Sequence, residues 1–278
     1  MKTLYLTDLD GTLLDETGHV SARSVDILNR LLANSVMLSF ATARSIVSST
    51  HVTAGVNWRL PVVVSNGVSL ADPVTRRALT HTAFTPQELA PLIRTVRQCG
   101  YRPMVYACID GIERCSWLQG QENDGLREYL NAPERENDDR LRPVQRFEQL
   151  WAGEVFCVVC MGRQEEFAEA YAEWSAGGRY QCFLSKQLYS DIWWLEALPA
   201  QATKANAARK LQNLLDCDRI VFFGDGENDA SLFAAADEAY APANAVPSIK
   251  TMATAVIGSN REDGVARWLA ENALPAEQ

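Results

Sequence analysis

Short apolar runs alternate with helical patterns over the first 70 residues, and the same rhythm returns near the C-terminus. This alternation is typical of parallel strands, because each parallel connection needs a crossover that packs on the sheet. Both ends of the chain therefore predict one α/β domain built on a Rossmann-like, doubly wound parallel sheet. Strands are expected at 3–7, 36–41, 62–65 and 219–223, and helices at 21–34, 46–54, 203–215, 228–236 and 263–273.

The segment between these halves has a different texture. Thr85-Pro86-Gln87-Glu88 has the threonine, proline and glutamate of a capped helix start, and this helix should end at Gly100. Asp110-Gly111 separates two apolar runs and predicts a hairpin. Antiparallel strands thus replace crossovers. Further elements are expected as a strand at 155–161, a helix at 164–175 and a second strand pair formed by 180–184 and 191–198.

We therefore expect residues 1–83 and 191–278 to form the core and residues 84–190 to form an inserted α+β cap. Within the insertion, residues 122–142 are dense in Asn, Asp, Glu and Arg. The simplest interpretation of this run is a solvated helix and loop.

Composition excludes several classes of function. The net charge is 26 − 35 = −9 and no block of Lys and Arg stands out, which argues against a nucleic-acid-binding surface. No apolar run approaches the roughly 18 residues of a membrane span. The apolar stretch before Asp8 is too short for a secretory signal, and the seven cysteines are scattered. We expect a soluble, cytoplasmic protein that is a monomer or a homodimer.

The first chemically suggestive residues are Asp8-Leu9-Asp10-Gly11-Thr12, directly after the first strand. Open α/β sheets bind ligands at the carboxyl ends of their strands. Residues two apart on an extended chain point the same way, so both carboxylates can face one crevice. The alternative is a plain polar turn, because Asp and Gly are common turn residues.

A second acidic cluster, Gly224-Asp225-Gly226-Glu227-Asn228-Asp229, follows the strand at 219–223. Two carboxylate clusters at the ends of neighbouring strands can share a cation. Mg²⁺ prefers oxygen ligands and is usually bound by one or two carboxylates plus phosphate oxygens. Asp8 and Asp225 fit that role.

Polar residues after the other strands could hold an anion. Thr42-Ala43-Arg44 offers a hydroxyl and backbone N–H groups, although Thr42 would look the same as a helix N-cap. Ser65-Asn66-Gly67 ends the next strand. Lys204, in the first turn of the helix before the Asp225 strand, could neutralise a nucleophile and a phosphoryl group, with Lys210 as its competitor.

Taken in order, these motifs resemble the haloacid dehalogenase superfamily, and the insertion resembles the large α/β cap of its Cof-type phosphatases. Asp8-Leu9-Asp10-Gly11-Thr12-Leu13-Leu14, Thr42-Ala43-Arg44, Ser65-Asn66-Gly67, Lys204 and the Asp225 cluster carry the resemblance, with Glu262-Asp263-Gly264-Val265-Ala266 near the end. Two departures are Ala43 and Ala205, where the family usually has Gly.

The resemblance implies a role for each matched position. Asp8 would be the nucleophile and Asp10 the general acid/base. Mg²⁺ would be bound by Asp8, Asp225 and the backbone carbonyl of Asp10, with Asp229 supporting these ligands. Phosphate or substrate contacts would come from Thr42, the Ala43 amide, Asn66, Lys204 and Asn228.

The expected reaction is Mg²⁺-dependent hydrolysis of a small phosphorylated metabolite through an aspartyl-phosphate. Sugar phosphates are the leading substrate guess, ahead of pyridoxal phosphate and nucleotides. Two alternatives stay open. One is a phosphotransferase or phosphomutase, in which a sugar hydroxyl replaces water. The other is a binding protein for phosphorylated ligands without turnover, against which the presence of both Asp8 and Asp10 speaks.

Overall fold

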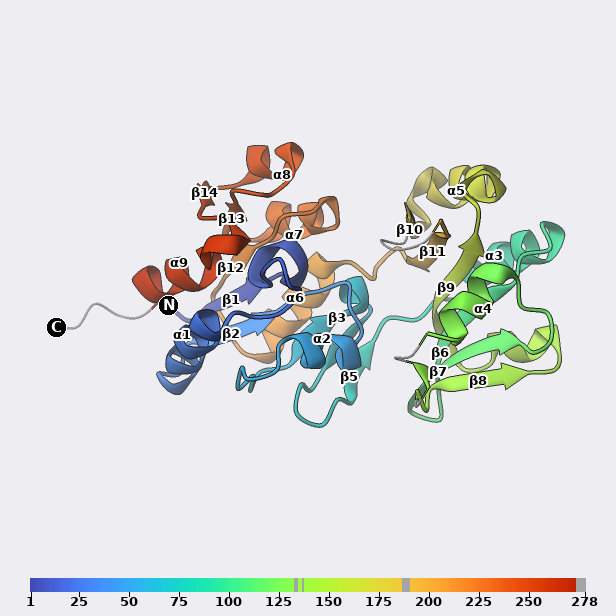
Figure 1. Cartoon of the computed structure of the whole chain (residues 1–278), viewed down its shortest axis with the longest axis horizontal. Coiled ribbons are helices and arrows are strands. Elements are labelled where there is room, and N and C mark those ends of the chain that lie inside the picture. Colours follow the sequence, from blue (N-terminus) through green and yellow to red (C-terminus); the bar gives the residue numbers. More distant parts are fainter. Residues whose placement is uncertain (133–134, 137, 187–190, 274–278) are drawn as a thin grey trace. The chain divides into compact units, whose positions relative to one another are not determined.

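The computed structural model describes residues 1–132, 135–136, 138–186 and 191–273, and the chain divides into two compact units (Figure 1). Met1–His81 and Ala202–Gln278 form the core unit, and Thr82–Gln201 form the inserted unit. No helix in the described part of the chain is both long and apolar enough to cross a membrane.

The core unit is built on a five-stranded parallel sheet in the order β14-β13-β12-β1-β2. From β1 the chain moves outward to β2, whereas β12, β13 and β14 extend the sheet in the other direction. The strand order therefore reverses between β1 and β12, the place where open α/β sheets bind ligands. The strands are β1 (Thr3–Thr7), β2 (Met37–Phe40), β12 (Arg219–Phe223), β13 (Glu238–Pro242) and β14 (Ala255–Ile257).

Helices cover both faces of this sheet. α1 and α9 pack in one apolar cluster, and α6, α7 and α8 pack in another. Strand β1 serves both clusters, because Leu4 and Leu6 face the second and Tyr5 packs against the first. The predicted doubly wound α/β fold is confirmed. The helices are α1 (Ala22–Ala33), α2 (Ile46–Val52), α6 (Lys204–Leu214), α7 (Ala230–Ala235), α8 (Pro247–Met252) and α9 (Gly264–Asn272).

The segment at 62–65, which was expected to be a third strand of the parallel sheet, pairs mainly in a different sheet. β3 (Val62–Val64) pairs antiparallel with β4 (Ser69–Ala71), which pairs with β5 (Ala78–His81) in a separate small sheet. A single parallel bridge, Ala41 to Val63, links β3 to the end of β2. The chain reverses because Ser65 and Asn66 adopt left-handed φ angles of 52° and 55°.

The inserted unit is a six-stranded sheet in the order β10-β11-β9-β6-β7-β8, antiparallel except between β7 and β8. Helices α3 and α5 pack with this sheet in one apolar cluster. Thr85 and Glu88 form the predicted capping box of α3. The elements are α3 (Pro86–Gln98), β6 (Pro103–Ile109), β7 (Ile112–Leu118), α4 (Asp124–Leu130), β8 (Leu141–Val144), β9 (Glu154–Gly162), α5 (Ala168–Ser175), β10 (Tyr180–Lys186) and β11 (Trp193–Pro199).

The second domain boundary also differs from the expectation. β11 forms full ladders with β10 and β9, so its residues belong to the inserted unit. The boundary expected at residue 191 is therefore wrong, and the division falls after Gln201. A domain boundary cannot separate β11 from β9 and β10, because the ladders with these strands satisfy its backbone hydrogen bonds.

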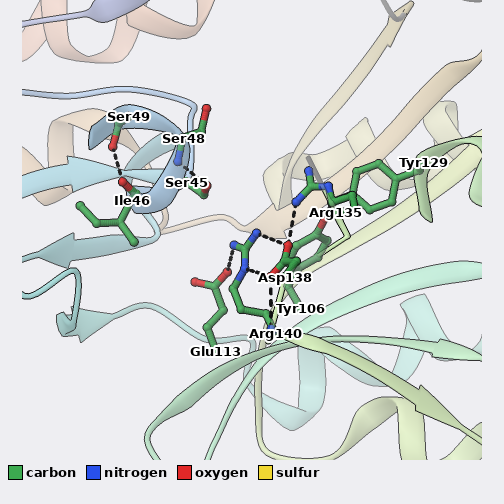
Figure 2. A network of polar contacts seen from close by, with 10 residues as sticks. All are labelled: Ser45, Ile46, Ser48, Ser49, Tyr106, Glu113, Tyr129, Arg135, Asp138 and Arg140. Carbon is green, nitrogen blue, oxygen red and sulfur yellow. Dashed lines mark hydrogen bonds and ion pairs between the residues drawn. The ribbon is translucent and has the colours of Figure 1, made fainter. Parts of the chain in front are cut away.

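The described residues of the polar run at 122–142 are packed more closely than a solvated helix and loop would be, and residues 133, 134 and 137 lie outside the described residues. Leu126 and Tyr129 of α4 are buried. Figure 2 shows that Arg140 donates hydrogen bonds to both Asp138 and Glu113. Arg135 also donates to Asp138, and its guanidinium lies over the Tyr129 ring. Burial disfavours the Asp138 carboxylate, but its bonds to the two arginines lower its pKa to about 2.

Candidate active site

The two carboxylate clusters follow β1 and β12, which are adjacent strands. The Asp8 N–H donates to the Phe223 carbonyl at 2.7 Å, and the Thr12 hydroxyl donates to the Asp225 carboxylate at 2.8 Å. Carboxylate oxygens of Asp8, Asp225 and Asp229 all lie within 4.8 Å of one another. Residues more than 200 positions apart in the sequence thus form one acidic centre at the strand-order reversal.

Lys204 lies inside this centre. Its Nζ donates to Asp8 Oδ1 at 2.9 Å and to Asp229 Oδ1 at 2.7 Å, and the side chain is 0% exposed. Lys204 is the first residue of α6, after the N-cap Thr203. The competing Lys210 is exposed on the same helix. The helix start, rather than its middle, therefore supplies the ammonium group beside Asp8.

A glycine sets the position of that helix start. Gly67 has a φ of +94°, and a Cβ at this position would overlap the Thr203 carbonyl. Only a residue without a side chain allows the turn after β3 to approach α6 so closely.

We expect Gly67→Ala to destabilise the protein by about 2 kcal/mol or more, because it adds a backbone clash to the cost of a left-handed alanine. Gly18→Ala is the matched control, since Gly18 has a φ of +75° and an open surrounding. The measurement is the free energy of unfolding in urea for both variants. Equal losses would show that the close approach to Thr203 has no energetic importance.

The electrostatics of the centre are unbalanced. Burial raises the pKa of Asp8 to about 8, against the opposing charge of Lys204 and with a further push from Asp229. Burial likewise raises the pKa of Asp225. Burial works against the Lys204 ammonium, but Asp8 and Asp229 outweigh it and raise its pKa. Three carboxylates thus share the ammonium group of Lys204.

The donor set fits a small divalent cation. Asp229 is fully engaged, since Oδ1 binds Lys204 and Oδ2 accepts the N–H groups of Asp225 and Gly226. Asp8 and Asp225 each keep one carboxylate oxygen that accepts no hydrogen bond from a side chain in the described residues. Two carboxylate oxygens and an excess of negative charge suit a hard cation. Asp229 would therefore support the site while Asp8 and Asp225 bind the ion.

The Asp10 carboxylate points elsewhere. It lies outside the cluster of Asp8, Asp225 and Asp229 and pairs with the guanidinium of Arg44 at 2.6 and 2.7 Å. Asp10 is followed by Gly11, whose φ is +70°. Its side chain is 54% exposed. Asp10 is thus accessible to a substrate that sits at the acidic centre.

The expected phosphate-binding residues include Thr42 and Ala43 after β2, Asn66 after β3 and Asn228 after β12, on three loops joined by hydrogen bonds. The N–H groups of Ser65 and Asn66 donate to the carbonyls of Arg44 and Thr42 at 2.9 and 3.0 Å. The Asn228 side-chain amide donates to Asn66 Oδ1 at 3.3 Å. Ala43 is exposed, and within the described chain its N–H has no partner. Hydroxyl, amide and free N–H donors therefore lie on neighbouring loops.

Thr42 does not cap α2. Ser45 is the N-cap, and its hydroxyl accepts the N–H of Ser48 at 3.3 Å (Figure 2). The Thr42 hydroxyl instead accepts the N–H of Arg44 at 3.2 Å. The alternative interpretation of Thr42 as a helix cap is wrong, because its hydroxyl bonds within its own loop, where Thr42 is fully buried.

Two residues near the centre had no assigned role in the sequence analysis. Asn244 donates its side-chain amide to the Gly11 carbonyl at 2.7 Å and so braces the loop after β1. It follows β13, a strand that was not expected from the sequence. Arg44 contacts Asp10 and was noted only as part of a motif. The sequence signal that could have indicated a role for Arg44 was a basic side chain next to a predicted phosphate-binding loop.

Known proteins resemble the chain over nearly its whole length. It is 24% identical to an Escherichia coli O6:H1 HMP-PP phosphatase, over 97% of this chain and 95% of that one. It is 23% identical to a Bacillus subtilis 5-amino-6-(5-phospho-D-ribitylamino)uracil phosphatase, over 94% and 95% of the two chains. A solved Thermotoga maritima structure shares the fold, with a TM-score of 0.79 at 21% identity and 99% coverage of both.

The sequence model of one protein family, described as haloacid dehalogenase-like hydrolase, matches residues 5–269. That span includes the acidic centre, the three loops and the inserted unit, so the resemblance seen in the motifs is confirmed. The chain therefore belongs to the haloacid dehalogenase-like hydrolase family and is a phosphatase, a phosphoric monoester hydrolase.

Proposed function

We propose that this phosphatase is Mg²⁺-dependent and hydrolyses a small phosphorylated metabolite, foremost a sugar phosphate, through an aspartyl-phosphate on Asp8. The observation that carries the proposal is the acidic centre, where Asp8, Asp225 and Asp229 converge on Lys204 and, within the described residues, Asp8 and Asp225 each keep one carboxylate oxygen without a side-chain hydrogen bond. A binding protein for phosphorylated ligands would need neither a nucleophile nor an acid/base.

Mg²⁺ would be bound by Asp8, Asp225 and the backbone carbonyl of Asp10, and when bound it supplies positive charge that favours ionised Asp8. The Asp8 carboxylate attacks phosphorus in line with the leaving oxygen, which Asp10 protonates. Asp10 then removes a proton from the water that hydrolyses the aspartyl-phosphate. Lys204, Thr42, the Ala43 N–H and Asn228 offset the charge on the phosphoryl oxygens. Asn66 positions Asn228.

The substrate can be found by a screen. The two relatives are named for HMP-PP and for a ribitylaminouracil phosphate, so both compounds belong in the panel beside sugar phosphates, pyridoxal phosphate and nucleotides. We expect one class to exceed the others in kcat/KM with Mg²⁺ present. Uniformly weak activity would contradict a dedicated substrate. Phosphorylated sugar product in place of free phosphate would identify a phosphotransferase or phosphomutase.

We expect Mg²⁺ to stabilise the fold more strongly at about pH 8 than at about pH 5. The pKa of Asp8 is raised from its ordinary value to about 8, so the stability that its protonated form contributes is complete below about pH 4 and is lost as the pH rises toward 8. The cation binds the ionised form, so its contribution grows over the same window. At 100 times its Kd it amounts to about 2.7 kcal/mol.

The measurement is the thermal midpoint with MgCl₂ and with EDTA across that pH range. Asp225→Asn is the comparison variant, because it removes one expected ligand and should flatten the Mg²⁺ effect. The same preparations should lose phosphatase activity in EDTA and regain it with Mg²⁺. An Mg²⁺ effect that falls toward high pH would contradict the assignment of Asp8 as a ligand.

A cytoplasmic location and a monomeric or homodimeric state complete the proposal. All seven cysteines are free thiols, which suits a reducing compartment. Cell fractionation tests the location, and light scattering on the purified chain tests the assembly.

A further inference from the structure

Arg44 binds Asp10 in a two-point arrangement. Its Nε–H donates to Asp10 Oδ2 at 2.7 Å, and its Nη2 donates to Asp10 Oδ1 at 2.6 Å. Paired bonds of this kind fix both the distance and the plane of a carboxylate, which a lysine cannot do. The orientation of the Asp10 carboxylate is therefore set by Arg44.

Arg44 is itself held on several sides. Its Nη1 donates to the Ser48 hydroxyl at 2.9 Å, and its side chain is 29% exposed. Its backbone N–H and carbonyl bond to the Thr42 hydroxyl and the Ser65 N–H. Bonding to Asp10 raises the pKa of Arg44, and the charge of Asp8 adds to this. A fixed and permanently charged guanidinium thus lies near both carboxylates of the loop.

Asp10 has no comparable support of its own. Its side chain is 54% exposed, and across the described residues Arg44 is its only side-chain partner. An exposed aspartate without a partner samples several rotamers. A carboxylate offers about four lone-pair sites, so the two that Arg44 occupies leave others for proton exchange.

We infer that Arg44 is the positioning residue for the acid/base: through its paired bonds it holds Asp10 where the carboxyl can protonate the leaving oxygen. This inference rests on the proposed function, in which Asp10 has that role. Arg44 acts through Asp10, so its loss should matter most where the leaving group needs a proton. A guanidinium that only bound the phosphoryl group would affect all substrates alike.

The test is a series of aryl phosphates, from 4-nitrophenyl phosphate, whose leaving group needs little protonation, to phenyl phosphate, whose leaving group needs more. The whole chain is assayed with Mg²⁺. We expect Arg44→Ala to lower kcat/KM about 100-fold for phenyl phosphate, the scale of acid catalysis, and only a few-fold for 4-nitrophenyl phosphate. kcat/KM reports the steps up to leaving-group departure, so the later hydrolysis does not mask the difference.

Rescue sharpens the test. Arg44→Lys should keep most of the defect, because an ammonium cannot make the paired bonds. Added methylguanidinium should restore part of the phenyl phosphate activity of Arg44→Ala, which a folding defect would not allow. Ser48→Ala should show a weaker form of the same pattern, and Arg23→Ala, an exposed arginine of α1, should show none.

Asp10→Asn separates this inference from the proposed function. If Asp10→Asn shows the selective loss and Arg44→Ala lowers both substrates equally or neither, the positioning role of Arg44 is overturned while the proposed function stands. If Asp10→Asn itself shows no dependence on the leaving group, the acid/base role of Asp10 fails and the inference fails with it.

Discussion

Asp8→Asn should abolish phosphate release, with a loss of roughly four orders of magnitude or more, the scale seen when a covalent nucleophile is removed. The amide is uncharged and a poor nucleophile, yet it keeps the shape of the side chain. The residue sits where β1 ends, beside Lys204 and within reach of Asp225. The measurement is phosphate release from an aryl phosphate in single-turnover conditions with Mg²⁺.

The same variant should remain folded. Asp8 is buried with its pKa raised to about 8, so replacing the carboxyl removes a group that is costly to ionise. Without Mg²⁺, Asp8→Asn should therefore unfold at a temperature equal to or above that of the unmodified protein. Asp26→Asn, an exposed change on α1, is the control for activity. Full activity in Asp8→Asn would rule out the proposed nucleophile.

Local patterns were sufficient where a strand is mostly buried and followed at once by polar residues. β1 and β12 lie within the expected ranges, because apolar runs of this length flanked by acidic turns have few other structures open to them. Their adjacency could be anticipated as well, since the carboxyl ends of parallel strands share one edge. The meeting of Asp8 with Asp225 follows from that arrangement.

Pairing partners were harder to predict. β3 is as apolar as a parallel strand, and only the left-handed turn at Ser65 and Asn66 sends the chain back into an antiparallel sheet. The expected pairing of β11 with β10 is confirmed, but the boundary expected at residue 191 separated the two strands. Strand pairing is a tertiary choice, decided by burial rather than by local preference.

Contacts made by individual side chains were the hardest feature to predict from the sequence. The pair of Arg44 and Asp10 joins residues 34 positions apart, and Asn244 reaches Gly11 across 233 positions. Neither spacing has a local signature. The network of Arg135, Asp138 and Arg140 shows the same limit, because a polar composition predicts solvent exposure unless the opposite charges are known to meet.

Lys204→Met should lose both activity and stability. The substitution keeps the length of the side chain but leaves Asp8, Asp225 and Asp229 without a cation, and removing one partner of a buried ion pair costs about 3–5 kcal/mol. The pKa of Lys204 is raised, so its contribution is complete at neutral pH and fades only as the pH rises through that raised value, above the ordinary one. We expect Lys210→Met, on the exposed side of α6, to change little.

The dependence on pH and Mg²⁺ distinguishes a charge effect from a packing effect in Lys204→Met. If charge dominates, the loss of unfolding free energy should grow from about pH 6 to about pH 9, because the pKa of Asp8 is about 8 with Lys204 present and rises further without it, so ionised Asp8 goes uncompensated only at the higher pH. Saturating Mg²⁺ should recover part of the stability, since the cation neutralises the same carboxylates, but not the catalytic rate, because the ammonium that faces the phosphoryl group is gone. Urea unfolding at both pH values, with and without Mg²⁺, measures the loss of unfolding free energy and the part that Mg²⁺ restores. A loss that is the same at both pH values and unchanged by Mg²⁺ would show that Lys204 acts by filling space rather than by balancing the acidic centre.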